Sequence, residues 1–211
     1  MHWIICPNQE AQARACASII AAKVLQKPAS IIGLATGSSP LGTYKELIKM
    51  REAGIVSFDN VRTFNLDEYV GLPKDHPQSY HRFMWDNLFA GLGFRAEQAQ
   101  LPNGMARDLE AECERYELAI EEAGCIDLQL LGIGHDGHIG FNEPADTYAK
   151  NTHIEHLTEL TIEANKRFFA PPDEVPRTAL TMGIGTIMRA RSILLTANGR
   201  DKAQIVRDAF L

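Results

Sequence analysis

The sequence predicts an α/β fold in which an open, mostly parallel sheet carries helices on both faces. Segments with the patterns of strands and of helices alternate along the chain, as they do in α/β proteins. Residues 126–133 (IDLQLLGI) carry apolar side chains on both faces of a predicted strand, which is typical of strands buried in a parallel sheet. The 211 residues suit a single domain, residues 1–211, because no linker, repeat or low-complexity tract divides them.

Local patterns justify the elements in order. Asn8 is a suitable N-cap for the Ala-rich helix that follows it, and Pro40 stands where the first turn of a second helix is expected. A charged amphipathic pattern predicts a helix over residues 108–123. The expected strands are 2–6, 30–35, 61–66, 126–133, 153–157 and 192–197. The expected helices are 8–26, 40 to about 53, about 79 to 89, 108–123, one from 161, and 201–210. This order of elements predicts a Rossmann-like sheet.

Composition and charge exclude several classes of protein. With 21 basic and 27 acidic side chains the formal net charge is −6, and no basic face favours a nucleic-acid partner. No stretch approaches the roughly 20 apolar residues that span a bilayer, and the apolar run at the N-terminus is too short for a signal peptide. The cysteines form no C-x-x-C pair and are expected to be reduced thiols: Cys6, Cys16, Cys113 and Cys125. We expect a cytoplasmic protein that binds neither nucleic acid nor membrane.

The segment Ala35-Thr36-Gly37-Ser38-Ser39-Pro40 follows the second expected strand. A strand that breaks into a turn of small residues and then a helix directs backbone N–H groups and the helix dipole at one point, which favours a phosphate cradle. The alternative is a tight turn in which Ser39 caps the helix. The segment is no Walker A loop, because Thr43 stands where that motif requires lysine.

Two adjacent carboxylates, Asp67 and Glu68, follow the strand expected at residues 61–66. Open α/β sheets bind their ligands at the carboxyl ends of their strands. One of the two carboxylates could therefore face the cleft as a general base. A solvated turn is the alternative.

The glycine-rich loop after the strand at residues 126–133 holds Asp136, His138 and Glu143 within a few residues of one another. A histidine flanked by carboxylates suits proton shuttling, and glycines let the backbone approach a ligand closely. This density of polar groups after a buried strand favours a functional loop.

Two other interpretations of this loop are weaker. Its glycines match G-x-G-x-x-G, but ionisable residues and Pro144 interrupt the helix that a dinucleotide site requires. A metal site would use His135, His138 and a carboxylate, and this spacing matches no strong zinc pattern. We expect neither a dinucleotide nor a metal.

Two cations complete the set of candidate residues. Lys202 lies at the start of the last expected helix, where a positive charge opposes the helix dipole unless an anion binds there. Arg167 precedes two phenylalanines. A surface lysine and an arginine at the edge of the core are the alternatives.

Taken together, four stretches resemble the glucosamine-6-phosphate deaminase family, within the wider superfamily that includes the 6-phosphogluconolactonases. They are residues 33–47, 64–84, 130–144 and 175–188, and they occur in the order of the family across most of the chain. The superfamily shares a G-x-G-x-D-G-H core. The continuation FNEP at residues 141–144 and the segment LDEY at residues 66–69 resemble the deaminases in particular.

The resemblance implies that D-glucosamine 6-phosphate and water become D-fructose 6-phosphate and ammonia, by aldose–ketose isomerisation and hydrolytic deamination in amino-sugar catabolism. It implies that His138 opens the pyranose ring, supported by Asp136 and Glu143. Asp67 would be the general base that moves the C2 proton to C1 through an enol intermediate. The family positions that hold the sugar phosphate match Thr36, Gly37, Ser38, Arg167 and Lys202. Neither hydride nor electron moves, so no metal or organic cofactor is expected.

The chain departs from the family in two places. Some hexameric members are activated by N-acetylglucosamine 6-phosphate, but the matching stretch here, residues 145–156, contains Asp146 and Glu155, which would repel a phosphate. We therefore expect no such activation, and a monomer or a small homo-oligomer. Family chains usually continue past the final helix, whereas this sequence ends at Leu211, so the domain is expected to lack the usual C-terminal strand and helix.

Two alternatives to the deaminase remain. One is a 6-phosphogluconolactonase, and the other is a sensor that binds a sugar phosphate without turnover. A sensor would be indicated by loss of Asp67 or His138, and both residues are present.

Overall fold

The computed structural model describes residues 1–169 and 171–211. Its centre is a five-stranded sheet in the order β4-β2-β1-β5-β8, in which every pair of neighbouring strands is parallel. The strands are β1 Ile31–Leu34, β2 Arg62–Asn65, β4 Ala99–Gln100, β5 Leu128–Leu131 and β8 Ile193–Leu195. After β1, the chain adds β2 and then β4 on one side of that strand. It then adds β5 on the other side of β1, and β8 beside β5. The carboxyl ends of β1 and β5 therefore flank the point where the strand order reverses, which is the usual ligand crevice of open α/β sheets.

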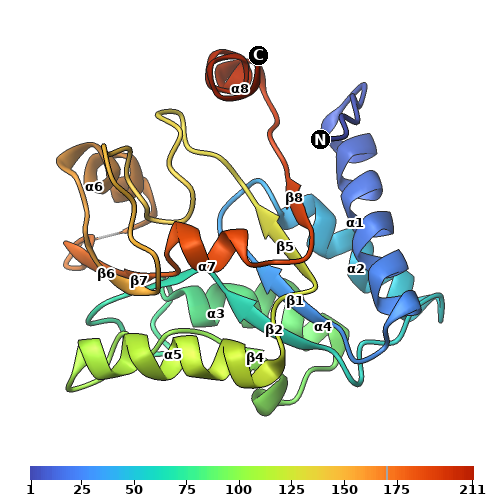
Figure 1. Cartoon of the computed structure of the whole chain (residues 1–211), viewed down its shortest axis with the longest axis horizontal. Helices are drawn as coiled ribbons and strands as arrows, with labels where there is room; N and C mark the ends of the chain where they lie inside the picture. The colour runs from blue at the N-terminus through green and yellow to red at the C-terminus, as the bar shows by residue number, and fades with distance from the viewer. Residues whose placement is uncertain (170) are drawn as a thin grey trace.

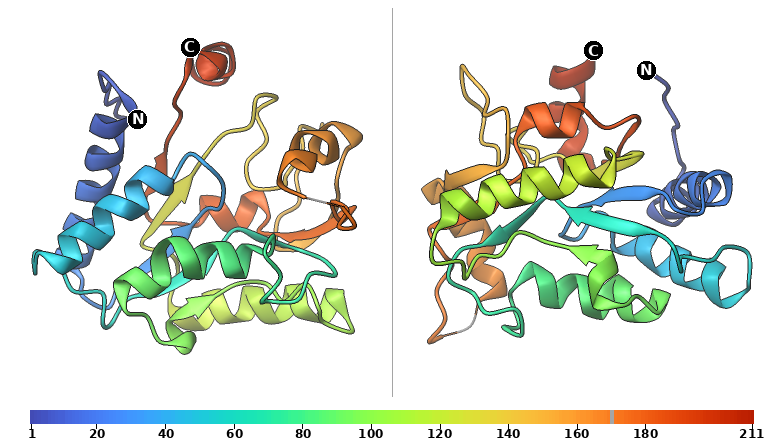
Figure 2. Two further views of the ribbon diagram at one scale, coloured as in Figure 1. Left: turned by 180° about the vertical axis from the view of Figure 1, so that it is seen from behind. Right: turned by 60° about the horizontal axis from the view of Figure 1, so that its bottom comes forward.

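Helices cover both faces of this sheet (Figures 1 and 2). One face packs against α1 Gln9–Gln26, α2 Leu41–Glu52 and a helix that runs from α3 Tyr80–Met84 through a π-helical segment, Trp85–Phe89, to α4 Ala90–Leu92. The other face packs against α5 Leu109–Ala123 and α7 Ile184–Met188. Alternate residues of β1 point to the two cores, since Ile32 and Leu34 contact the first and Ile31 the second. The predicted fold class is confirmed.

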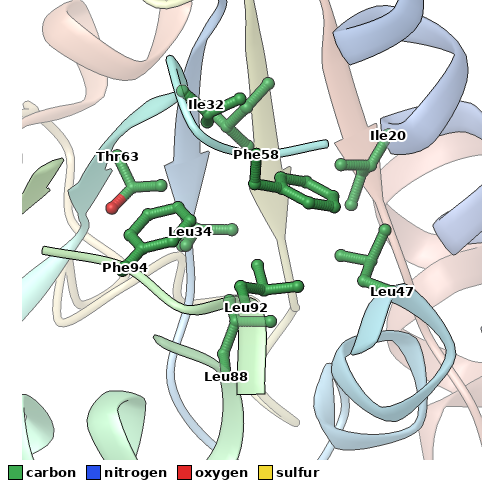
Figure 3. Close-up of a pocket in the computed structure, with 10 residues that line it drawn as sticks. Ile20, Ile32, Leu34, Leu47, Phe58, Thr63, Leu88, Leu92 and Phe94 are labelled. Atoms are coloured by element: carbon green, nitrogen blue, oxygen red, sulfur yellow. The ribbon is translucent and has the colours of Figure 1, made fainter. Parts of the chain in front are cut away.

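The first core closes around a small cavity between the sheet and its helices (Figure 3). Ile20, Leu34 and Leu47 line it from α1, β1 and α2, and Leu88 lines it from the π-helical segment. Thr63 is the one polar residue in the lining. A cavity with so little polar surface suits packing and not the binding of a charged metabolite.

A second sheet, in the order β3-β7-β6, is antiparallel and was not expected. It consists of β3 Asp67–Tyr69, β7 Thr178–Thr181 and β6 His153–His156, of which only the last was predicted. Two of the three residues of β3 are acidic, so the segment lacks the apolar pattern of a strand. Leu66 separates β2 from β3, and its carbonyl accepts the N–H of Met182 at 2.7 Å, which fixes where the chain passes from one sheet to the other.

The strand expected at residues 2–6 is a wrong prediction. Trp3 is 52% exposed and Ile5 94% exposed, and within the described chain this segment pairs with no strand. Trp3 instead makes an edge contact with Phe210 of α8 Ala203–Phe210, with ring centroids 5.6 Å apart. An apolar alternation forms a strand only where a neighbouring strand supplies hydrogen bonds and a buried face.

The remaining predicted elements are confirmed, with shifts of a few residues at their ends. The Asn8 side chain caps α1 by accepting the N–H of Ala11 at 2.9 Å. The helix expected from residue 161 begins earlier, as α6 Glu159–Asn165, because Thr158 caps it. The four cysteines are free thiols, as expected. No helix in the described ranges is both long and apolar enough to cross a membrane.

Candidate active site

The loops that follow β1 and β5 lie side by side at the crevice. A Cβ atom built on Gly132 would lie 4.0 Å from the Cβ of Ser39. The hydroxyl of Tyr44 is buried and donates to the carbonyl of Ala35 at 2.5 Å, which fixes the end of β1. Gly37 adopts φ +110°, a conformation that favours glycine.

The residues of the expected phosphate cradle stand at the mouth of this crevice. Thr36 is half-buried, whereas Gly37 and Ser38 are exposed. The alternative in which Ser39 caps the next helix is wrong, because the N-cap of α2 is Pro40. Within the described residues no side chain caps that helix, so its first N–H groups are available to an anion.

Asp67 is 5% exposed and lies between the two loops. Its Oδ1 accepts a long hydrogen bond from the Thr36 hydroxyl at 3.4 Å, and its Oδ2 lies 3.2 Å from where a Cβ on Gly140 would stand. Gly140 has φ +62°, so both its conformation and this close approach favour glycine. The alternative of a solvated turn is therefore wrong for this carboxylate.

Burial and, to a smaller extent, the negative charge of Glu68 raise the pKa of Asp67 to about 7, and the Thr36 hydroxyl opposes both effects. A carboxyl group that titrates near neutrality can both take up and return a proton during one turnover.

The loop after β5 brings the three predicted acid–base residues together. His138 Nδ1 lies 2.7 Å from Asp136 Oδ1, which also accepts the backbone N–H of His138 at 3.2 Å. Burial disfavours the charged form of Asp136, but the N–H and the charge of His138 outweigh it and hold the pKa of Asp136 below its ordinary value. A Cβ on Gly134 would overlap the His138 ring, so only glycine fits there.

Glu143 completes this group from the far end of the loop. Its Oε1 accepts the hydroxyl of Thr161 at 2.5 Å and that of Thr158 at 3.2 Å. One oxygen or nitrogen from each of Asp136, His138 and Glu143 lies within 4.8 Å of the others. They could contact one cation at that spacing, but they equally form a compact set for moving protons.

Strand β7 holds this loop against Asp67. Asn142 is buried and donates through Nδ2 to the carbonyls of Ile139 and Met182, both at 2.9 Å. The Thr181 hydroxyl accepts the N–H of Phe141 at 3.1 Å, and Thr181 is also the register partner of Asp67. The sequence analysis missed Thr181 and Thr161, because each meets its partner only through the fold.

Lys202 approaches the same loop from the C-terminal end of the chain. Its Nζ lies 3.2 Å from His135 Nδ1, and His135 Nε2 lies 2.7 Å from Asp201 Oδ2. Burial lowers the pKa of Lys202, against the opposing charges of Asp201 and Asp136. Figure 1 and the left view of Figure 2 show the loop after β5 lying between α6 and α8.

Arg167 stands apart from the other candidates. It is exposed in the 3₁₀ turn Lys166–Phe168, and its guanidinium lies 4.7 Å from the centre of the Phe168 ring. The described contacts therefore connect Lys202, and not Arg167, to the predicted site residues.

Comparison with known proteins places the chain among sugar-phosphate enzymes. The family of glucosamine-6-phosphate isomerases and 6-phosphogluconolactonases matches residues 8–211. A glucosamine-6-phosphate deaminase of Thermoanaerobacter sp. (strain X514) is 53% identical over 210 residues, which cover 100% of this chain and 83% of the relative. A relative of the same name from Clostridioides difficile (strain 630) is 50% identical and covers 98% of this chain and 83% of its own length.

The structural comparisons agree with the sequence comparisons. The solved structure of a monomeric glucosamine-6-phosphate deaminase superposes with a TM-score of 0.95 at 46% identity, covering 99% of this chain and 86% of that one. The 6-phosphogluconolactonase of Thermotoga maritima superposes with a TM-score of 0.70 at 20% identity, covering 93% of this chain and 84% of that one, a likeness of fold alone. The chain belongs to the glucosamine-6-phosphate isomerase/6-phosphogluconolactonase family.

Proposed function

We propose that this chain converts D-glucosamine 6-phosphate and water to D-fructose 6-phosphate and ammonia. The observation that carries the proposal is a buried carboxylate, Asp67, lying between a phosphate cradle and a loop that presents His138 with two further carboxylates. Relatives named glucosamine-6-phosphate deaminase, at 53% and 50% identity over nearly the whole chain, support the same activity.

Ring opening is assigned to the loop after β5. His138 exchanges a proton between the ring oxygen and the hydroxyl at C1, which frees the aldehyde. Asp136 lies 2.7 Å from Nδ1 and favours the orientation in which Nε2 faces the substrate. Glu143, held by Thr158 and Thr161, supports the same transfer.

Isomerisation and deamination follow at Asp67. The carboxylate takes the proton from C2 of the open-chain aldehyde, and the aldehyde oxygen takes up the proton that the C2 ammonium group releases, which leaves an enol with a neutral amino group at C2. The protonated carboxyl then returns that proton to C1, which gives the imine of the ketose. Water adds to the imine carbon and ammonia leaves, so the atoms balance. Because Asp67 is buried, the proton in transit is protected from exchange with bulk water.

The phosphate group is assigned to the mouth of the crevice. The predicted ligands Thr36, Gly37 and Ser38 supply backbone N–H groups and hydroxyls at the start of α2, and Lys202 supplies positive charge. Arg167 completes the proposed set from the segment after α6. We propose no metal and no organic cofactor, because each step is a proton transfer or the addition and loss of water or ammonia.

The alternative activities have less support. The solved 6-phosphogluconolactonases are about 20% identical and share the fold only. A sensor without turnover would have no use for a buried carboxylate whose pKa is raised to about 7. We further propose that the protein acts in the cytoplasm as a monomer, in line with the monomeric deaminase that superposes on it.

The experiment that tests the function is an assay of ammonia and fructose 6-phosphate released from glucosamine 6-phosphate in the presence of EDTA. 6-Phosphogluconolactone serves as the parallel substrate. We expect equimolar release of both products and no hydrolysis of the lactone. Hydrolysis of the lactone without release of ammonia would assign the protein to the neighbouring activity, and inactivity on both substrates would favour a sensor.

A further inference from the structure

Glu68 is a buried carboxylate that the proposed reaction leaves without a role. It is 4% exposed, and the groups that the described structure places on it are backbone N–H groups and no cation. Its Oε1 accepts the N–H of Tyr69 and of Tyr80, each at 2.9 Å, and its Oε2 accepts the N–H of His81 at 2.8 Å. Placing a carboxylate in the interior without a cation is costly, so these three hydrogen bonds stabilise it.

These hydrogen bonds fix the start of α3. The first N–H groups of a helix have no partner within the helix. Here Glu68 accepts those of Tyr80 and His81, and the Ser79 hydroxyl accepts that of Arg82 at 3.1 Å. Glu68 therefore joins β3 to α3 across the intervening loop, residues 70–79.

The start of α3 in turn contacts the loop after β5. The Tyr80 ring stacks on the Phe141 ring, with centroids 5.8 Å apart and planes inclined by 4°. Phe141 lies between Gly140, which touches Asp67, and Asn142, which anchors the loop to β7. A shift in the first turn of α3 would consequently displace the loop that carries His138 and Glu143.

Glu68 also acts on Asp67 through its charge. Successive side chains of a strand point to opposite faces, so the Asp67 carboxylate faces the crevice while that of Glu68 faces α3. Burial raises the pKa of Glu68 itself to about 7, against the three hydrogen bonds that it accepts, so the two carboxyl groups titrate over the same range and ionisation of Glu68 disfavours that of Asp67.

We propose that Glu68 is a positioning residue of this enzyme: it holds α3 and the loop after β5 in register, and it places a negative charge behind the general base. The proposal rests on the assignment of Asp67 as that base.

The phenol groups near Asp67 and Glu68 do not titrate between pH 5 and 9. They come from β3, α3, α2 and α5 and are the phenols Tyr69, Tyr80, Tyr44 and Tyr116. Burial raises the pKa of each phenol, so all four stay neutral from pH 5 to 9. His81 donates its backbone N–H to Glu68, and its ring is a separate titratable group. Burial and the charge of Lys74 lower the pKa of this ring, so the ring is uncharged above neutrality.

The test compares Glu68→Gln and Glu68→Asp with the matched control Glu112→Gln. Glu112 is likewise buried and accepts a backbone N–H, that of Asn103 at 2.8 Å, but it lies on α5 beside Arg115. The first readout is the titration of the Asp67 carboxyl carbon by NMR of protein labelled at aspartate, assigned with Asp67→Asn. The second is kcat and kcat/KM for glucosamine 6-phosphate against pH.

We expect Glu68→Gln to move the titration of Asp67, and the acid limb of kcat/KM with it, to lower pH by about 0.5 unit or more. Glu68→Asp keeps the charge, but its shorter side chain no longer reaches the N–H groups at the start of α3. It should therefore leave the acid limb of kcat/KM in place and lower kcat about tenfold or more. Glu112→Gln should lower only the Tm.

An unmoved Asp67 titration in Glu68→Gln overturns the role of the charge, and an unchanged kcat in Glu68→Asp overturns the positioning of α3. Should Glu68→Gln fail to fold, Glu68→Asp decides the positioning of α3, and Glu68→Ser replaces Glu68→Gln in the titration of Asp67. An inactive wild-type protein would refute the proposed deaminase activity, and the NMR titration, which needs no substrate, would still decide for Glu68.

Discussion

Asp67, the proposed general base, opposes the stability of the fold. In the unfolded chain the pKa of Asp67 is near its ordinary value of 3.8, and burial, with a smaller effect of the Glu68 charge, raises the pKa in the folded protein to about 7. Between these values the folded protein holds a proton that the unfolded chain has released. The free energy of unfolding therefore falls as the pH rises from about 4 to about 7, the reverse of the usual effect of an ion-paired aspartate.

Replacing Asp67 with asparagine should separate these two effects. Loss of the general base is expected to lower kcat at least about 10²-fold with a modest change in KM, because the amide cannot take the C2 proton. The same variant should be more stable at pH 8 by about 1 to 4 kcal/mol, which is about 2 °C or more in Tm. The gain should shrink as the pH falls toward 4.

Both halves of this prediction are measurable on one preparation, by steady-state kinetics and by thermal unfolding at pH 4 to 8. Unchanged kcat would remove Asp67 from the mechanism. A stability gain independent of pH would show that the gain does not come from the ionisation of Asp67.

Individual site residues were predictable where the chain itself brings them together. Asp136, His138 and Glu143 stand in one glycine-rich loop, and Asp67 stands at the end of a strand, so local pattern and strand-end position were sufficient to propose them as candidates. Glu68 and Thr161 were not predictable as positioning residues. Their partners lie 12 to 18 residues away, and no spacing rule connects them.

Among the elements, α6 determines how firmly Glu143 is held. Thr158 caps this helix by accepting the N–H of Thr161 at 3.2 Å, and both hydroxyls donate to the same oxygen of Glu143. The position of α6 and the orientation of the Glu143 carboxylate are therefore coupled. If α6 shifts and the Thr161 hydroxyl moves away, Glu143 Oε1 loses its nearest hydrogen-bond donor.

Replacing Thr161 with valine should weaken this coupling while preserving the shape of the side chain. We expect kcat to fall about tenfold with little change in KM, because the loss concerns a group that acts in the chemical step and not one that binds the phosphate. Thr161→Ser keeps the hydroxyl and serves as the control, with kcat near that of the wild type. Equal kcat values for the valine and serine variants would show that this contact does not orient Glu143.

At the scale of elements, local pattern decided what could be predicted. Helices α1 and α5 carry caps and patterns over 18 and 15 residues, and the sequence located both. Strands β3 and β7 have three and four residues, and they form a sheet only because each supplies the other with hydrogen bonds. The antiparallel sheet that carries Asp67 thus depends on contacts between segments more than 100 residues apart.

At the scale of the whole molecule, the proposed anion site lies on a protein with a net charge of −6. The backbone N–H groups at the start of α2 follow β1, and the ammonium of Lys202 contacts His135 in the loop after β5, so the pairing of β1 with β5 underlies the proposal that they bind one anion. Net charge excluded a polyanionic partner but could not reveal this site. The field of a few nearby groups exceeds that of distant surface charges screened by salt.

The outer strand of the second sheet carries the last prediction. β6 forms one edge of that sheet, and its Glu155 lies 3.0 Å from His153. Asp146 is exposed in the segment that precedes it. A phosphate brought to this edge would meet the carboxylates of Glu155 and Asp146, and the ring of His153 is already paired with Glu155. The electrostatic energy of binding is therefore unfavourable.

We therefore expect N-acetylglucosamine 6-phosphate to leave the rate unchanged at every substrate concentration, with hyperbolic kinetics and a light-scattering mass near 23.4 kDa. Sigmoidal kinetics abolished by that ligand, together with a mass several times larger, would mean that an effector site forms between subunits despite these charges.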